Sequence, residues 1–261
     1  MTNDDGVISP GLWALRKALA NLGDIVIIAP DGPRSATSMS LTFHKPLRIN
    51  RVSIERTEAF SVSGNPADCV SLGINQILKG KKPSVVVSGM NEGDNTSAQS
   101  AFASGTVASA IQASIMGVPA VAFSTVASEG SQPSQDEYES RLRKGFEVAR
   151  RIVKWIMSEG LPRRIDFLNV NFPSHVGEQT PIRVTRLARR RYDDFIVERL
   201  DPREVPYYWQ TGSVLGSTDK DTDVYAVHVE RAISITPMSL DISASMDPAV
   251  VKKILKHTKG G

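Results

Sequence analysis

The sequence predicts an α/β fold in which helices cover a doubly wound, mostly parallel sheet, followed by an extended C-terminal β arm. Continuous apolar runs, typical of strands buried on both faces, stand at 25–30, 84–88 and 120–124. Segments with the 3.6-residue spacing of amphipathic helices alternate with these runs, which is the pattern of parallel α/β sheets. After Pro181 the chain alternates apolar and polar residues and is rich in β-branched side chains, which predicts the arm.

The predicted helices have recognisable ends. Ser9 and Pro10 read as an N-cap followed by proline at the first helical position, and Gly23 ends this first helix. Asn65 and Pro66 repeat this start for a second helix that runs to about residue 80. Further expected elements are a loop leading into a helix over 101–116, a polar loop over 126–136, a long amphipathic helix over 138–156 and a strand over 167–172.

The change of pattern after Pro181 predicts that the chain divides into three regions. Residues 1–180 form the α/β core, 181–240 a β arm and 241–261 a helical segment. Within the arm, strands are expected over 182–198 and 224–236, separated by a polar, turn-rich stretch that contains Tyr207, Tyr208 and Trp209. Such an arm serves oligomerisation, or it is a local hairpin that covers the core; the residues alone leave both readings open.

One element of the predicted sheet is nearly absent. A helix from Pro10 followed by a strand at Ile25 requires an earlier strand, because a right-handed crossover joins two parallel strands. Only Met1 and Thr2 precede Asn3. We therefore expect that residues upstream of Met1, such as a short basic and apolar stretch, complete this strand.

Composition excludes several classes of protein. The 261 residues suffice for one large domain or a domain with an appendage, and the net charge of +3 is too small to predict binding to a nucleic-acid polymer. No apolar run reaches the ~18–20 residues of a transmembrane helix, so no membrane partner is expected. Cys69 is the single cysteine, which excludes an internal disulfide and fits a cytoplasmic location. The basic run at 189–191 is a solvated strand or a contact with an anionic substrate.

Four polar segments follow predicted strands or open predicted helices. In open parallel sheets such positions meet at the carboxyl edge, where ligands bind. The segments are Asn3–Gly6, Arg34–Thr37, Ser88–Asn95 and Ser104–Thr106. The sequence therefore predicts one site that these segments share.

Each segment has a chemical reading and a structural one. Asp4 and Asp5 are hard oxygen ligands suited to Mg²⁺, Mn²⁺ or Ca²⁺, or else the tip of an Asx turn. Ser35 offers a hydroxyl to a metal, or caps a turn. Asn91 offers an amide oxygen to the metal, and Gly93 permits close backbone approach to a phosphate. 

Ser104, Gly105 and Thr106 combine free N–H groups with hydroxyls at a helix start, which is an anion site or a plain N-cap. Among the four histidines, only His44 lies near a candidate segment. Metalloprotease, serine-hydrolase and paired-cysteine motifs are absent from the sequence.

Taken together, these segments resemble the SurE survival-protein family of nucleotide phosphatases. The resemblance covers nearly the whole chain in the family's order. The matching segments are Thr2–Gly6, Ala29–Asp31 with Arg34–Thr37, Ser63–Asp68, Ser88–Asn91 with Gly93 and Asn95, Ser104–Thr106, Arg190–Tyr192, Asp201–Pro202, Tyr208–Trp209, Thr222–Asp223 and Ser234–Pro237. The resemblance implies a Rossmann-like core and a homodimer or homotetramer built partly through swapped C-terminal arms.

The resemblance also implies an activity and a ligand set. One divalent metal, Mg²⁺ or Mn²⁺ with Ca²⁺ as an inert occupant, is expected on Asp4, Asp5, Ser35 and Asn91. The implied reaction is hydrolysis of nucleoside 5'- or 3'-monophosphates. The remaining site residues are expected to bind substrate: Asn3, Gly93, Ser104, Gly105 and Thr106.

The residues support a mechanism of the same kind. A metal neutralises phosphate charge and acidifies a water, while Asp4 or Asp5 orients that water. The sequence lacks the Asp-x-Asp-x-Thr pattern of phosphatases that form an aspartyl phosphate, which favours water as the nucleophile. Two alternatives are a nucleotide-binding protein with little turnover and an exopolyphosphatase or general acid phosphatase.

Overall fold

The computed structural model describes residues 1–128, 133–217 and 219–257. Its helices are α1 Pro10–Leu19, α2 Pro66–Leu72, the π-helix η1 Gly73–Ile77, α3 Ser97–Ala103, α4 Gly105–Ile115, α5 Gln135–Glu159, α6 Asp223–His228 and α7 Pro248–His257. Its strands are β1 Ile28–Pro30, β2 Ile49–Ile54, β3 Thr57–Val62, β4 Val86–Glu92, β5 Ala120–Thr125, β6 Phe167–Phe172, β7 Ile182–Val184, β8 Tyr192–Leu200, β9 Pro206–Val214 and β10 Ile233–Met238.

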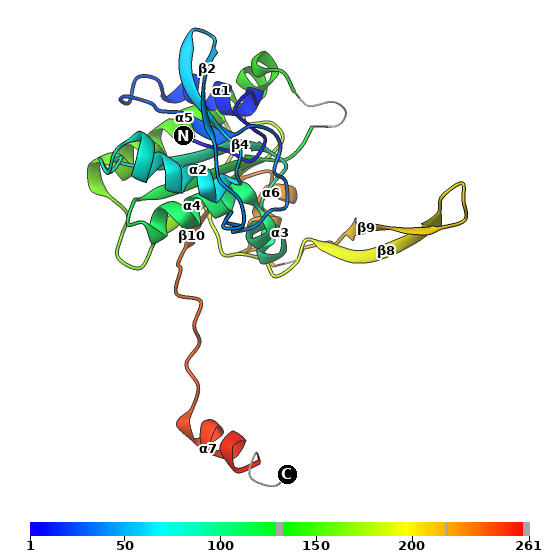
Figure 1. The fold of residues 1–261 in the computed structure, drawn as a ribbon. Helices are drawn as coiled ribbons and strands as arrows, with labels where there is room; N and C mark the ends of the chain where they lie inside the picture. Colours follow the sequence, from blue (N-terminus) through cyan, green and yellow to red (C-terminus); the bar gives the residue numbers. More distant parts are fainter. Residues whose placement is uncertain (129–132, 218, 258–261) are drawn as a thin grey trace.

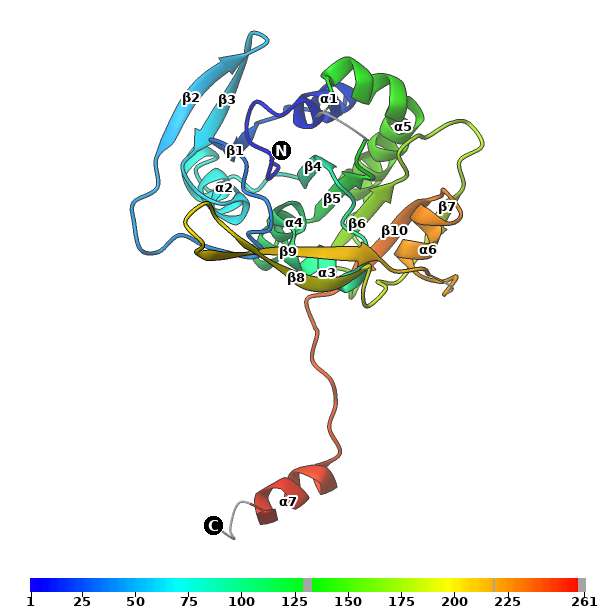
Figure 2. The ribbon, with the colours of Figure 1, turned by 90° about the vertical axis from the view of Figure 1, so that its right-hand side faces the viewer.

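The strands of the core form two sheets that lie side by side, edge to edge (Figure 2). One has the order β1-β3-β2 and the other the order β4-β5-β6-β10-β7. Strands β4, β5 and β6 are parallel, as are β1 with β3 and β10 with β7, whereas β10 runs antiparallel to β6 and β2 antiparallel to β3. The predicted mostly parallel sheet is confirmed.

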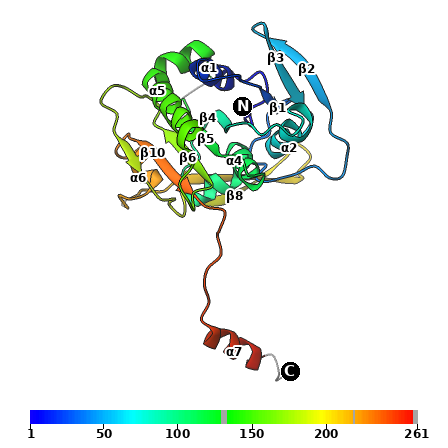
Figure 3. The same cartoon turned by 90° about the vertical axis from the view of Figure 1, so that its left-hand side faces the viewer.

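Helices cover both faces of this sheet, which makes the fold doubly wound (Figure 1, Figure 3). Helices α1 and α5 pack against one another and bury Leu15, Tyr138 and Phe146 against β4–β6. On the opposite face α2 and α4 bury mainly small residues such as Ala110 and Ala113. The small residues of α4 let the helix lie close to the sheet, which brings its N-terminus to the strand ends.

Local sequence signals set the helix starts as expected. Proline occupies the first turn of both α1 and α2. Asn65 caps α2 in a capping box with Asp68, and Ser134 does the same for α5 with Glu137. Among the described residues, no helix has both the length and the apolar character that crossing a membrane requires.

Several predicted boundaries differ from the structure. Residues 224–228 of the expected strand 224–236 belong to α6, which the Thr222 hydroxyl caps, and only the end of that segment is β10. Residues 101–103, expected in a loop, belong to α3. The strand expected at 84–88 begins at Val86 but continues to Glu92, with an irregularity in its pairing between Ser88 and Asn91.

The arm is shorter than the predicted region 181–240. It consists of the antiparallel pair β8–β9, which extends away from the core (Figure 1), whereas β7 and β10 join the core sheet. The expected helical segment contains α7, which lies at the end of an extended stretch well away from the core. The polar loop expected at 126–136 lies partly outside the described residues.

Met1 and Thr2 stand where the two sheets would otherwise join. Thr2 bridges Ser88 in parallel, and the Met1 carbonyl accepts a 2.9 Å hydrogen bond from the N–H of Ile28. The N-terminus thus lies between β1 and β4 (Figure 2, Figure 3). Met1 and Thr2 thus occupy the position of the strand that the topology requires. That residues upstream of Met1 complete this strand stays a prediction.

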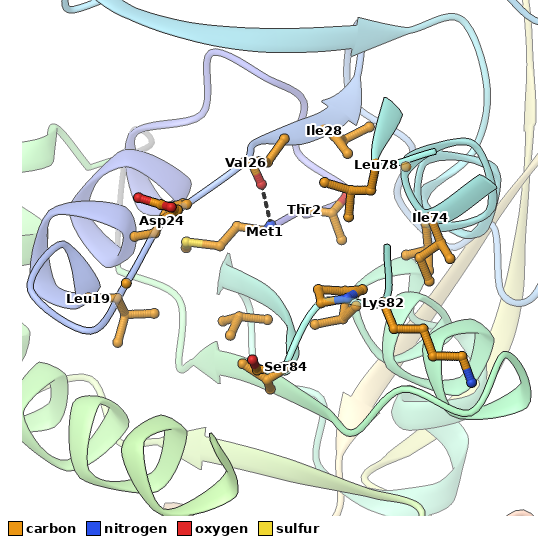
Figure 4. Close-up of a pocket in the computed structure, with 18 of the residues that line it drawn as sticks. Met1, Thr2, Leu19, Asp24, Val26, Ile28, Ile74, Leu78, Lys82 and Ser84 are labelled. Atoms are coloured by element: carbon orange, nitrogen blue, oxygen red, sulfur yellow. Dashed lines mark hydrogen bonds between the residues drawn. The ribbon is translucent and has the colours of Figure 1, made fainter. Parts of the chain in front are cut away.

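An apolar cavity of about 530 Å³ continues the line of Met1 and Thr2 away from the site. We call it the strand slot; it lies between residues 24–28 and 84–87, with Leu19, Ile74 and Leu78 among its lining side chains. The Met1 amino group enters it and donates a 2.6 Å hydrogen bond to the Val26 carbonyl (Figure 4). Burial lowers the pKa of this amino group to about 5.

Candidate active site

The candidate site lies at the point where the strand order reverses. The chain runs from Thr2 through α1 to β1 on one side of the Met1–Thr2 stub, and β4 flanks the stub on the other side. In doubly wound sheets this switch point opens a crevice at the carboxyl ends of the strands. Residues 3–6 follow Met1 and Thr2 directly and so lie at the carboxyl ends of these strands, where the sequence analysis expects the site.

Asn3 closes the turn that presents the two aspartates. Its amide nitrogen donates to the Gly6 carbonyl at 3.1 Å, and its amide oxygen accepts from the Gly6 N–H at 3.2 Å. Gly6 has a φ of 102°, a conformation that favours glycine. The Asn3 side chain therefore has a turn-forming role here, and its predicted contact with substrate stays a prediction.

Asp4 is buried against the N-terminus of α4. The Thr106 hydroxyl donates to Asp4 Oδ1, and the N–H groups of Gly105 and Thr106 also favour the ionised carboxylate. Burial is the largest effect, and it raises the pKa of Asp4 above its ordinary value. A Cβ on Gly105 would lie 2.8 Å from Asp4 Cβ and 2.9 Å from Pro66 Cγ, so only glycine permits this approach.

Asp5 lies beside Asp4 with a different set of partners. Burial, followed by the nearby Asp4 charge, raises the pKa of Asp5 to about 7, against a favourable hydrogen bond from the Glu92 N–H. Its Oδ2 is buried and has no hydrogen-bond donor among the described residues. A buried carboxylate oxygen without a donor is costly unless a cation or water meets it.

Asn91 reaches the same region from the end of β4. Its side chain is largely buried, and its Nδ2 donates to the Gly93 carbonyl at 2.6 Å, which leaves the amide oxygen as the atom suited to a cation. Gly93 has a φ of 114°, and its N–H donates to the Thr125 carbonyl at 2.9 Å. The Gly93 N–H thus already has a partner, and its predicted role toward phosphate stays a prediction.

The segment after β1 is tied to the aspartates through its backbone. The Arg34 N–H donates to the Asp4 carbonyl at 2.7 Å, and the exposed Ser35 comes next in the chain. The Thr37 hydroxyl donates to the Arg34 carbonyl and closes this turn. The structure therefore holds the segment that carries Ser35 against Asp4.

The segment that opens α4 caps its own helix and also contacts Asp4. The Ser104 hydroxyl accepts from the Val107 N–H at 3.1 Å and caps the helix, while the Thr106 hydroxyl is directed to Asp4. Both hydroxyls that the sequence assigns to phosphate thus have protein partners. Ser104–Thr106 supports Asp4, and direct contact between this segment and phosphate stays a prediction.

A divalent cation fits the donor set. Two carboxylates, an amide oxygen and a hydroxyl are the hard oxygen donors that Mg²⁺ and Mn²⁺ prefer. The donorless Asp5 Oδ2 marks the atom that a cation would satisfy. No group of three or more histidine, cysteine, aspartate or glutamate side chains suited to a metal occurs among the described residues, so the amide and hydroxyl oxygens would be needed.

Sequence reasoning missed two polar pairs beside the site. Glu92 forms a 2.9 Å ion pair with Arg141, and Asp94 lies 3.0 Å from Nε2 of His228. Both acids lie within the predicted segment Ser88–Asn95, which was an available signal, but their partners are distant in sequence. His44, the histidine singled out above, lies exposed.

Known proteins are similar to this chain over nearly its whole length. A family model described as "Survival protein SurE" matches residues 1–194. The protein named 5'-nucleotidase SurE from Methanocella arvoryzae is 39% identical over 261 residues, which cover 98% of this chain and 97% of that protein. Its namesake from Thermofilum pendens is 40% identical over 259 residues, which cover 99% of this chain and 96% of that protein. A crystal structure of the SurE protein from Aquifex aeolicus has a TM-score of 0.78 and 37% identity, covering 99% of this chain and 98% of the other.

Proposed function

Because the chain belongs to the Survival protein SurE family, we propose that it is a phosphatase that hydrolyses nucleoside monophosphates to nucleoside and phosphate. The relatives named 5'-nucleotidase support this class of reaction. The observation that carries the proposal is Asp5 Oδ2, a buried carboxylate oxygen without a donor, beside Asp4 at the switch point of the sheet. Phosphoryl transfer at a divalent cation uses an oxygen-rich site of this kind.

The residues divide the work. Asp4, Asp5, Ser35 and Asn91 would hold one Mg²⁺ or Mn²⁺, which supplies neutralisation of phosphate charge and acidification of water when bound. Thr106 keeps Asp4 in place through its hydroxyl. Asp4 or Asp5 orients the attacking water by accepting its hydrogen bond, so that the oxygen faces the phosphorus. Water, rather than an aspartate, forms the new bond to phosphorus while the bond from phosphorus to the nucleoside oxygen breaks. The water loses a proton to solvent and the departing nucleoside oxygen gains one, so the products are nucleoside and phosphate.

The proposal extends to partners and location. Ca²⁺ would occupy the site without supporting turnover. The chain forms a homodimer or homotetramer through its C-terminal arm and works in the cytoplasm. Exposed apolar residues on β8 and β9, including Phe195, Ile196 and Trp209, support an interface on the arm.

The test is phosphate release from a panel of 5'- and 3'-nucleoside monophosphates with Mg²⁺ or Mn²⁺. We expect turnover that EDTA abolishes, and a loss of roughly 100-fold or more in Asp5→Asn, because both the ligand charge and the oriented water are disturbed. Asp136→Asn is the matched control, since Asp136 is exposed on α5. Equal turnover in wild type and Asp5→Asn would refute the proposal, and faster release from polyphosphate would assign the chain to exopolyphosphatases.

A second candidate is a nucleotide-binding protein with little turnover. The observation that favours it is that the groups expected to steady the phosphate, the Ser104 and Thr106 hydroxyls and the Gly93 N–H, already have protein partners. Calorimetry that detects nucleotide binding, together with no phosphate release over hours at saturating Mn²⁺, would favour this candidate.

A further inference from the structure

Glu92 is the last residue of β4 and the neighbour of Asn91. Its Oε1 accepts hydrogen bonds from the N–H and the hydroxyl of Ser128, at 2.6 and 2.9 Å, and its Oε2 accepts from Nη2 of Arg141 at 2.9 Å. Arg141 also donates to the Ser128 hydroxyl. We call Glu92, Ser128 and Arg141 the Glu92 cluster; three donor groups thus hold one carboxylate.

The Glu92 cluster is withdrawn from water. The side chains of Arg141 and Glu92 are 16% and 11% exposed, whereas those of Lys17 and Glu139, an ion pair that also involves α5, are 62% and 30% exposed. The Arg141 guanidinium also lies over the ring of Tyr138, 5.3 Å from its centroid. A partly buried ion pair with several hydrogen bonds fixes geometry more firmly than a surface pair.

The cluster ties three separate elements to the metal-binding segment. Glu92 ends β4, Ser128 belongs to the segment after β5, and Arg141 lies on α5. Helix α5 departs from helical geometry at Leu142, directly after Arg141. The Arg141 carbonyl accepts from the Val176 N–H at 3.1 Å, so the backbone around this departure is anchored as well.

Two features connect the cluster to the candidate site. The N–H of Glu92 donates to the Asp5 carboxylate, so the place of the Glu92 backbone decides whether that bond forms. The Glu92 charge also acts on Asp5, and Arg141 forms an ion pair with Glu92. The carboxylate of Glu92 accepts hydrogen bonds from Ser128 and Arg141. Its function is therefore to support its neighbours in the chain rather than to bind the metal directly.

We propose that Glu92 and Arg141 are positioning residues of the metal site, which act as one unit to hold Asn91 and Asp5 in place for the cation. This inference rests on the proposed metal-dependent phosphatase function. Neither residue contacts the cation or the substrate. Because the two residues act through the same contacts, loss of either one has the same consequence as loss of both.

The test is calorimetric titration of Mn²⁺ into the full chain without substrate. We expect Glu92→Ala and Arg141→Ala each to weaken Mn²⁺ binding about tenfold, the range found for residues that orient metal ligands. The double variant should also lose about tenfold rather than a hundredfold. Arg141→Lys should recover part of the affinity. Lys17→Ala, which breaks the exposed pair, is the matched control and should bind Mn²⁺ as wild type does.

Turnover supplies a second readout. We expect the kcat of Glu92→Ala to fall at low Mn²⁺ and to recover at saturating Mn²⁺, with little change in KM for the nucleotide. If the alanine variants fail to fold, as judged by circular dichroism, Glu92→Gln and Arg141→Lys replace them, and weaker Mn²⁺ binding is again expected.

Three results would overturn the inference. They are unchanged Mn²⁺ affinity despite a lower Tm, opposite effects of the two single variants with a wild-type-like double variant, and additive losses. Failure of the proposed function is distinguishable, because wild type and Asp5→Asn would then bind Mn²⁺ equally. If Asp5→Asn abolishes Mn²⁺ binding while the Glu92 and Arg141 variants bind Mn²⁺ as wild type does, this inference is contradicted and the proposed function is not.

Discussion

Asp4 and Asp5 are adjacent in the chain but meet different environments. Asp4 receives the Thr106 hydroxyl and the N–H groups that begin α4, which together favour its ionised form. Asp5 receives the Glu92 N–H but leaves Oδ2 without a donor. One carboxylate is thus fixed by the protein while the other retains an oxygen for a ligand, a difference that burial makes energetically important.

Thr106 should matter through Asp4 rather than through phosphate. Thr106→Val removes the hydroxyl but keeps the shape, and a hydrogen bond to a charged group contributes about 1.5–3 kcal/mol. We expect kcat/KM to fall roughly 10- to 100-fold, with weaker Mn²⁺ binding in calorimetry. Thr106→Ser restores the donor and should recover most of the activity. A variant that lost activity with unchanged Mn²⁺ affinity would assign Thr106 to the substrate instead.

Asp5 should make the metal-free protein less stable as pH rises. Its pKa is about 7 in the folded state against 3.8 as the ordinary value, so the folded state binds its proton more tightly. The contribution of this proton to the free energy of unfolding is fully present below pH 3.8 and is lost as the pH rises through 7. In EDTA, the stability of Asp5→Asn relative to wild type should therefore increase by about 2–3 kcal/mol between pH 5 and pH 8.

Urea unfolding at several pH values measures this difference. Asp136→Asn provides the control, because it is the same chemical change at an exposed position of α5. A difference between Asp5→Asn and wild type that stays constant with pH would mean that Asp5 titrates near its ordinary value. Metal binding should strengthen over the same pH range, since the cation binds the ionised carboxylate.

The sequence predicted which segments share a site but not which atoms they use. Asp4 and Asp5 follow Thr2, the Arg34 N–H of the segment carrying Ser35 donates to the Asp4 carbonyl, and Asn91 lies near the end of β4. That these residues bind one metal stays a prediction. The partners of the Thr106 hydroxyl and the Gly93 N–H depend on distances of a few ångströms between elements far apart in sequence. Periodicity and turn propensity carry no such distances, which is also why the Arg141–Glu92 pair was missed.

At the scale of elements, the errors lie where tertiary contacts override local pattern. The β-branched segment 224–236 begins as α6 because Thr222 caps it and the Asp223 carboxylate accepts the N–H groups of Ser97 and Ala188. Strand β4 continues through Gly89 because β5 pairs with it as far as Glu92. Among the apolar runs predicted as buried strands, 120–124 matches β5 closely, whereas only Ile28–Pro30 of the run 25–30 forms β1 and the run 84–88 begins β4 at Val86.

The strand slot gives an element-scale prediction. Val26 and Val87 accept hydrogen bonds from Met1 and Thr2, so their neighbours two residues back, Asp24 and Val85, face the same gap. Four apolar residues added before Met1 should continue the strand in parallel with both sides. The Met1 nitrogen would then be an amide N–H, which would donate to the Val26 carbonyl in place of the buried amino group.

The experiment compares an Ile-Val-Val-Ile extension with a Gly-Ser-Asn-Gly extension of equal length. Burial of each large apolar side chain contributes about 1.5–3 kcal/mol against about 1.5 kcal/mol of ordering per residue, so a gain of about 3 kcal/mol is expected. This corresponds to a Tm roughly 6–10 °C higher by calorimetry, with tighter Mn²⁺ binding because Asp4 and Asp5 gain an anchor. Equal Tm values for the two extensions would show that the slot does not accept a strand.

At the scale of the whole molecule, the chain divides into a packed core and two parts that leave it. Strands β8 and β9 pair with each other along their length, from Tyr192↔Val214 to Leu200↔Pro206. Helix α7 ends an extended stretch and exposes Val250, Val251, Ile254 and Leu255. Neither part contributes to the buried clusters of the core, so the core should fold without the arm.

Deletion of the arm should therefore change assembly and spare the fold. Tyr208 and Trp209 are neighbours on β9 and are 60% and 61% exposed, so they form an apolar patch rather than isolated surface aromatics. The exposed edges of the two strands can also pair with a strand of another chain. Replacing residues 193–213 by a two-glycine turn should lower the molar mass in solution, measured by light scattering after size exclusion. The Tm of the core should change by only a few degrees.

Trp209→Glu tests the exposed surface of the arm without removing the arm. The variant keeps the β8–β9 hairpin and adds a charge to its exposed face. We expect it to shift the assembly in the same direction as the deletion, at protein concentrations near the dissociation constant. Glu198→Gln, a change on β8 at another exposed position, is the control and should leave the mass unaltered. An unchanged molar mass for the deletion would instead direct attention to α7, whose apolar face is the other surface able to hold two copies together.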